Sequence, residues 1–178
     1  IDMKINGEFV KGVESWASLS VMKTKEDIVG DFITNADGTK TEAGYIPRPT
    51  DQRVNFSMFF QDYIPGKPNY KMHLNLIYGT GLSFGPPNSE KHQDVLRIPD
   101  YRRVDIGFSA VIKSANKQAK LKWLNAFESI WLSAEVFNLL DINNTVSYLW
   151  VADVSGRQYA VPNYLTARQL NAKLILSF

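Results

Sequence analysis

The sequence contains no cysteine, so disulfide frameworks and thiolate metal sites are excluded. It also lacks any run that approaches about 18 apolar residues, the length that a helix needs to cross a membrane. Any residence in a membrane must therefore use β-strands. The formal net charge of +2 is too small and too evenly spread to favour nucleic acid as a partner.

The two histidines do not lie in a pattern that supports catalysis. His73 falls within an alternating segment and His92 falls in a loop segment, and neither has a partner at metal or triad spacing. We interpret them as a hydrogen-bonding residue and a solvated residue. The glycine-rich stretch 79–85 does not match a nucleotide-binding loop, because it follows a strand without opening a helix. The sequence thus predicts no enzyme, no cofactor and no metal site.

Alternation of polar and apolar residues is the dominant pattern of the sequence. Successive side chains of a strand point to opposite faces, so this period separates an apolar face from a polar face. With weaker segments at 1–10 and 15–23, the pattern predicts about seven strands and almost no helix. The residues that share the apolar faces of the five clearest segments are Val54, Phe56, Met58 and Phe60; Tyr70, Met72, Leu74, Leu76 and Tyr78; Val104, Ile106, Phe108, Ala110 and Ile112; Ile130, Leu132, Ala134 and Val136; and Leu170, Ala172, Leu174, Leu176 and Phe178.

The connections between these segments alternate between long and short. Long connections therefore gather at one end of the predicted sheet and short ones at the other. This sorting is typical of outer-membrane barrels, which have long outer loops, short inner turns and strands with apolar side chains outward. We expect the apolar faces to point outward, toward lipid. The long segments are 28–51, 83–100 and 141–164, and the shorter ones are 11–14, 65–68 and 115–128.

One segment carries a family resemblance. AEVFNLLDINNTVSY, at 134–148, resembles the penultimate strand of TonB-dependent outer-membrane receptors, in which a strand ends in an Asn-Leu-hydrophobic-Asp box before an outer loop. Leu140 stands where an aromatic residue is commoner. The residues that match the box are Asn138, Leu139, Leu140 and Asp141.

Other parts of the chain extend the resemblance. Segments 101–109 and 47–57 resemble earlier strands of such receptors. Phe178 matches the terminal aromatic residue that the barrel-assembly machinery recognises, which makes it a candidate assembly signal. The resemblance covers the whole chain. The plug and the remaining strands of the family have no counterpart in these residues.

The resemblance implies an all-β fold, namely the wall of an antiparallel transmembrane β-barrel. Residues 1–178 would supply about seven C-terminal strands of a barrel of about 22 strands. Seven strands cannot close alone without leaving two bare edges in lipid. Because the chain also opens at Ile1 without a signal segment, we expect a C-terminal piece of a longer chain, although a second chain could supply the rest.

The function implied by the resemblance is import of a scarce nutrient, such as a metal chelate, a vitamin or an oligosaccharide, across the outer membrane of a Gram-negative bacterium. The implied partners are outer-membrane lipid, the remainder of the barrel with its plug, and the TonB energy-coupling complex. Whether a surface lipoprotein is a further partner is a question that the sequence leaves open. The alternatives are a soluble antiparallel β-sandwich that binds sugar or protein, a passive porin, and a barrel with a lipid-modifying active site.

The predicted outer loop 141–164 is the place where a substrate would be met, because specificity in barrels lies in loops and lumen. Its aromatic rings can stack on ligand rings, and its polar atoms can bind hydroxyls or carboxylates. A β-ribbon that turns at Ser155 and Gly156 and extends the wall is the second interpretation, and both can hold. The candidate ligand-binding residues are Tyr148, Trp150, Arg157 and Tyr159.

Overall fold

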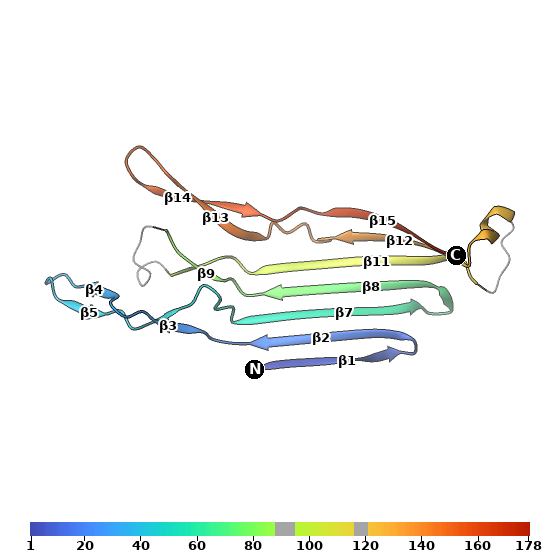
Figure 1. Ribbon diagram of the computed structural model, residues 1–178, viewed down its shortest axis with the longest axis horizontal. Coiled ribbons are helices and arrows are strands. Elements are labelled where there is room, and N and C mark those ends of the chain that lie inside the picture. Colours follow the sequence, from blue (N-terminus) through green and yellow to red (C-terminus); the bar gives the residue numbers. More distant parts are fainter. Residues whose placement is uncertain (88–94, 116–120) are drawn as a thin grey trace.

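A seven-stranded, antiparallel, open sheet is the main element of the chain (Figure 1). The structure is a computed structural model that describes residues 1–87, 95–115 and 121–178. The predictions of an all-β fold and of about seven antiparallel strands are confirmed. In sheet order, the strands are β1 (Asp2–Val10), β2 (Val13–Val21), β7 (Val54–Ile64), β8 (Lys67–Gly79), β11 (Tyr101–Lys113), β12 (Ser129–Phe137) and β15 (Gln169–Ser177).

The register of the strands brings the apolar residues of the predicted alternating segments together on one face. Leu74 of β8 lies opposite Phe60 of β7 and opposite Ile106 of β11. Ile106 in turn lies opposite Val136 of β12, which lies opposite Leu170 of β15. Because side chains alternate along each strand, these even-numbered residues share one face, here named the even face, and their odd-numbered neighbours share the odd face. The direction in which the even face points stays a prediction.

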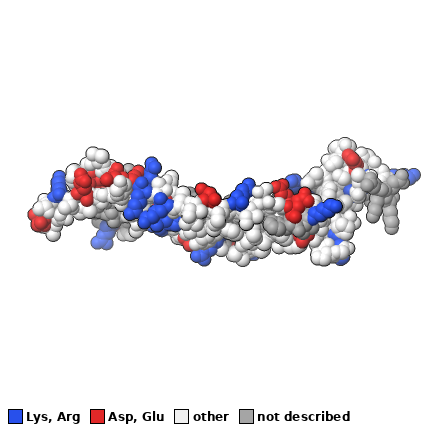
Figure 2. Space-filling view, turned by 90° about the horizontal axis from the view of Figure 1, so that it is seen from below, with Lys and Arg blue, Asp and Glu red and all other residues white. Residues whose placement is uncertain are grey.

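The even face has little packed against it. Among the described residues, the buried hydrophobic side chains are those of Val13, Ile46 and Ile130. On the even face, Phe108 is 48% exposed and Leu174 is 60% exposed. Seen edge-on, the molecule is a long thin layer (Figure 2). Its accessible surface is 12387 Å², whereas a compact monomer of this mass exposes about 8,800 Å².

Long and short connections lie at opposite ends of the sheet, as predicted (Figure 1). The end with the long connections is called the loop end, and the other is called the turn end. Turns with positive φ at Gly12 and Gly66 join β1 to β2 and β7 to β8. The 3-10 helix η1 (Lys122–Ala126) between β11 and β12 was not predicted. No helix in the described part of the chain is long and apolar enough to cross a membrane.

Four two-stranded ribbons shape the loop end. Three of them are too short to show a period in the sequence and were not predicted. The ribbons pair β3 (Lys25–Asp27) with β6 (Tyr45–Pro47), β4 (Phe32–Thr34) with β5 (Lys40–Glu42), β9 (Ser83–Phe84) with β10 (Leu96–Arg97), and β13 (Thr145–Ala152) with β14 (Gln158–Tyr164).

Candidate functional site

The predicted β-ribbon within 141–164 is present as the β13–β14 hairpin. Its register separates the four candidate contact residues. Tyr148 and Trp150 lie on one face of the hairpin, whereas Tyr159 pairs with Val151 and therefore lies on the other face. Arg157 belongs to the turn. The structure therefore divides the predicted set into two groups.

The group at the hairpin turn is organised by Asp153. Its carboxylate accepts hydrogen bonds from the Ser155 hydroxyl and from the backbone N–H of Arg157. These two donors lower the pKa of Asp153 below its ordinary value. The Tyr159 hydroxyl lies 3.4 Å from the same carboxylate. The Tyr159 hydroxyl and the Arg157 backbone N–H are thus both bonded to Asp153. The main role of this group is therefore to stabilise the turn.

The other group meets the neighbouring long loop. The rings of Phe84 in β9 and Tyr148 in β13 are stacked, with centroids 4.6 Å apart and 9° between their planes. The Trp150 ring lies 6.1 Å from that of Phe84. This contact joins loops that are separated by more than sixty positions in the sequence. Phe84, which the sequence did not single out, is the residue that connects them.

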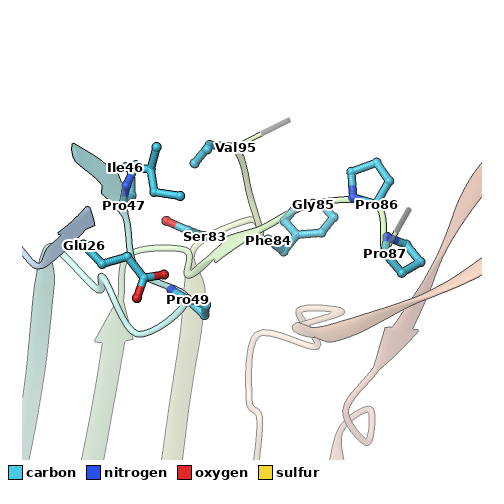
Figure 3. A pocket seen from close by; sticks show the side chains of 10 residues that line it. All are labelled: Glu26, Ile46, Pro47, Pro49, Ser83, Phe84, Gly85, Pro86, Pro87 and Val95. Atoms are coloured by element: carbon cyan, nitrogen blue, oxygen red, sulfur yellow. The ribbon is translucent and has the colours of Figure 1, made fainter. Parts of the chain in front are cut away.

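A pocket of about 290 Å³ opens beside Phe84 (Figure 3). Its walls are largely apolar, and its polar groups include the side chains of Glu26 and Ser83. The hydroxyl of Ser83 points toward the space between Glu26, Ile46 and Val95 (Figure 3). In the sequence, the signal that could have indicated this site is two closely spaced pairs of prolines, Pro47 with Pro49 and Pro86 with Pro87. The lining residues are Glu26, Ile46, Pro47, Pro49, Ser83, Phe84, Gly85, Pro86, Pro87 and Val95.

Asp51 fixes the loops that form the pocket. Its side chain is fully buried and accepts hydrogen bonds from the Thr24 backbone, from Arg53 Nε and from Arg97. Burial by itself raises the pKa of Asp51, but these three donors outweigh it and lower the pKa to about 2. Arg97 also donates to the carbonyl oxygen of Gly81 at 2.8 Å. One carboxylate thus holds together two long connections of the loop end.

The Asn-Leu-hydrophobic-Asp box turns the chain out of β12. Asn138 is 3% exposed, and both it and Asp141 have positive φ, at 51° and 54°. The Asn138 amide donates to the carbonyl of Ile142 and accepts from its N–H. Asp141 accepts a hydrogen bond from the backbone of Arg168, at the start of the return to β15. These contacts give the box a structural role in shaping the loop.

The remaining members of the box differ in exposure. The backbone N–H of Leu139 donates to the carbonyl of Val104 in β11 at 2.7 Å. The side chain of Leu140 is 57% exposed. Leu140 therefore occupies a surface position, where a larger aromatic side chain would also fit without displacing a core.

Phe178 lies at the turn end, where its ring meets that of Phe127 with centroids 4.9 Å apart. The side chain is otherwise 87% exposed. A single ring contact at an exposed terminus contributes little to the stability of the sheet. This exposure leaves Phe178 open to another protein, and its role as an assembly signal stays a prediction.

His73 lies on the odd face near the middle of β8. Its Nε2 atom is 3.8 Å from Glu135, and its ring covers Gly107 on the neighbouring strand. No group of three or more possible metal ligands is present in residues 1–87, 95–115 and 121–178. His92 lies outside the described residues. The arrangement around His73 is a polar contact between strands.

The comparisons with known proteins add no family to this description. The chain matches no family model, no curated protein and no solved structure.

Proposed function

We propose that this chain is the C-terminal wall of a TonB-dependent outer-membrane transporter. The single observation that carries the proposal is an apolar sheet face with no covering layer in the described residues. In water, such a face would be covered by a second layer, because a sheet buries its apolar side against another element. Lipid is the solvent in which the face needs no protein cover.

The dimensions of the sheet support the proposal. A tilted strand needs about 9 to 11 residues to cross a bilayer. The strands of the main sheet have 9 to 13 residues. Each of the seven is therefore long enough to span the hydrocarbon core.

The unpaired edges of the sheet support a larger barrel. In the described sheet, β1 pairs with β2 alone and β15 pairs with β12 alone. Each edge thus presents backbone groups that cost several kcal/mol apiece when left unpaired in lipid. Further strands of the same protein would satisfy both edges and close the barrel. The remainder of the barrel and the plug are therefore the first partners of this chain.

The odd face supports a lumen that is filled by protein. Ser18 of β2 lies opposite Ser57 and therefore belongs to this face, and the two hydroxyl oxygens are 2.8 Å apart. The hydroxyl oxygens of Ser109 and Ser133, in β11 and β12, are also 2.8 Å apart. Asp105, which is 5% exposed, accepts hydrogen bonds from Arg103 and Asn138. Such short polar side chains and internal pairs suit contact with a plug better than contact with bulk water.

Transport itself rests on the family resemblance of residues 134–148 and 101–109. By that resemblance, the protein imports a metal chelate, a vitamin or an oligosaccharide with energy from the TonB complex, and a surface lipoprotein can cover the loop end. The loop end, with its long connections and aromatic residues, would face the outside of the cell. The short turns would face the periplasm.

The test uses the full-length protein that contains this chain, expressed with its own leader in a Gram-negative host. We expect it in the outer-membrane fraction, with faster migration on gels before boiling than after, because folded barrels resist the detergent. In liposomes it should conduct no small solutes, since a plug fills the lumen. Free conduction would indicate a porin instead. A soluble monomer with cooperative unfolding would contradict the proposal and indicate the sandwich.

A further inference from the structure

The Ser83 hydroxyl is unusual within the described part of the chain. The residue is 7% exposed, and its Oγ is the one buried side-chain oxygen or nitrogen there without a hydrogen-bond partner. Buried hydroxyls are normally paired, because an unpaired one loses its bonds to water without replacement. This oxygen borders a pocket (Figure 3). A partner that enters the pocket could therefore supply the missing hydrogen bond.

The second polar group of the pocket is the Glu26 carboxylate. Its Oε2 lies 3.4 Å from Arg48 Nε, and its side chain is 28% exposed. An ionised carboxylate accepts hydrogen bonds and cannot donate them. The Ser83 hydroxyl can do both, and rotation about its χ1 angle redirects it among three staggered positions. Together they fit a ligand edge that carries hydroxyl groups.

The walls and size of the pocket define the rest of the ligand. Proline rings and the Phe84 ring line it, so they favour the apolar face of a ring. A volume of about 290 Å³ is at the lower end of the range for small-molecule sites, which suits one ring rather than several. Among the described residues that line the pocket, the one charged side chain is that of Glu26. An anionic ring is therefore disfavoured.

We propose that the pocket between Glu26, Ser83 and Phe84 binds one neutral ring that bears hydroxyl groups at its edge. The ring packs on the prolines and Phe84, donates to Glu26 and pairs with the Ser83 hydroxyl. Such a ring can be a sugar unit of a glycan or a phenolic ring of a smaller molecule. This inference deepens the proposed function and rests on it. The pocket lies at the loop end, which faces arriving substrate if the proposed function holds.

The aromatic contact with the hairpin extends the site. Phe84 lines the pocket with one part of its surface and stacks on Tyr148 with its ring face. This connection joins the pocket to Tyr148 and Trp150, the two predicted contact residues that the structure brings together.

The experiment measures binding to the full-length protein in detergent by saturation-transfer NMR. The probes are methyl glucoside and methyl galactoside for sugars, catechol for phenols, and glucuronate as the charged counterpart. We expect one neutral class to bind and glucuronate to bind at least fivefold more weakly. Ser83→Ala should weaken binding about fivefold, the ratio for one lost hydrogen bond of about 1 kcal/mol. Glu26→Gln should weaken it similarly and reduce the discrimination against glucuronate.

Ser147→Ala, in the exposed β13 strand, is the matched control and should bind as the unaltered protein does. Ser83→Ala should keep the stability of the parent, because it removes an unpaired group. The inference is overturned if no neutral probe binds, if glucuronate binds best, or if both pocket variants bind normally. Heat-dependent migration of the same samples on gels distinguishes failure of this inference from failure of the proposed function. A folded barrel without binding removes this inference alone, whereas loss of the barrel behaviour removes the proposed function.

Discussion

The backbone N–H of Asn138 donates a 2.8 Å hydrogen bond to Oδ1 of Asp105, and both residues are buried. Asp105 belongs to the segment 101–109 and Asn138 to the segment 134–148. The two segments that carry much of the family resemblance pair along β11 and β12, and this hydrogen bond joins them where β12 ends. Arg103 Nε donates to the same Asp105 oxygen at 2.7 Å. The carboxylate therefore fixes the start of the loop that follows.

The first prediction concerns the backbone of Asn138. Its φ of 51° suits glycine and asparagine, whereas alanine is strained there. Asn138→Ala loses both the conformation and the side-chain bonds to Ile142, so we expect a loss of about 2 to 3 kcal/mol in unfolding free energy. Asn138→Gly keeps the conformation and should lose about half as much. Equal losses in urea unfolding would show that backbone strain plays no part.

The second prediction concerns the close approach of Gly107 to His73. A Cβ at Gly107 would overlap the imidazole ring of His73, which lies opposite it in β8. Gly107→Ala should displace the ring from Glu135 and lower the unfolding midpoint by an amount equivalent to about 1 to 2 kcal/mol. Gly7→Ala in β1, which has open space, is the control and should be neutral. The double variant His73→Ala with Gly107→Ala should recover part of the loss, and no recovery would contradict the steric cause.

The third prediction concerns Phe178. Its ring contact with Phe127 is worth about 0.5 to 1.5 kcal/mol, which is small beside the stability of a barrel. If Phe178 is an assembly signal, its deletion should lower the amount of protein in the outer membrane far more than the melting temperature of what assembles. Phe127→Ala removes the same contact but keeps the terminus, so its membrane level should stay normal. Similar levels for all three proteins would remove the assembly role.

The fourth prediction concerns pH and the Asp51 carboxylate. Its pKa is lowered to about 2 in the folded chain, so its stabilising bonds are complete above about pH 4 and are lost as the pH falls through 2. Asp51→Asn should speed amide hydrogen exchange of the segments around Thr24 and Arg97 about 10- to 100-fold at neutral pH. This difference from the parent should shrink as the pH approaches 2.

Asp37→Asn is the control for this prediction. The pKa of Asp37 is also lowered, by the side-chain and backbone hydrogen bonds of Thr39, but both residues lie in one exposed turn. Its substitution should therefore affect exchange in the β4–β5 turn alone. If Asp51→Asn leaves exchange near Arg97 unchanged, the carboxylate does not join the two loops.

The main sheet was predictable because its physical signal is local. In β8, apolar and polar residues alternate from Tyr70 to Tyr78 almost without exception, and the strand forms over that range. The signal persists because each face of the strand meets one kind of environment along its whole length. The hairpin β13–β14 was predictable for the same reason, with Gly156 at positive φ in its turn.

The pocket was not predictable because its residues come from separate connections. Glu26 and Ile46 lie in the β3–β6 ribbon and Ser83 lies in the β9–β10 ribbon, and the strands of both ribbons are too short for a period. The Asp51 cluster joins Thr24 and Arg97, which are far apart in the sequence. Such contacts depend on the three-dimensional path of the loops. The separation of Tyr159 from Tyr148 likewise follows from register rather than from composition.

The most direct test of the central claim is a single-cysteine scan of β8, from Tyr70 to Tyr78, in the full-length protein reconstituted in lipid. This chain has no cysteine of its own, so a spin label attaches within it at the introduced position alone. Collisions with oxygen report lipid, and collisions with a water-soluble nickel reagent report aqueous or polar surroundings. If the even face meets lipid, Met72, Leu74 and Leu76 should show high oxygen and low nickel accessibility, with lower oxygen accessibility at the odd positions between them. High nickel accessibility on the even face, or no two-residue period, would contradict the account.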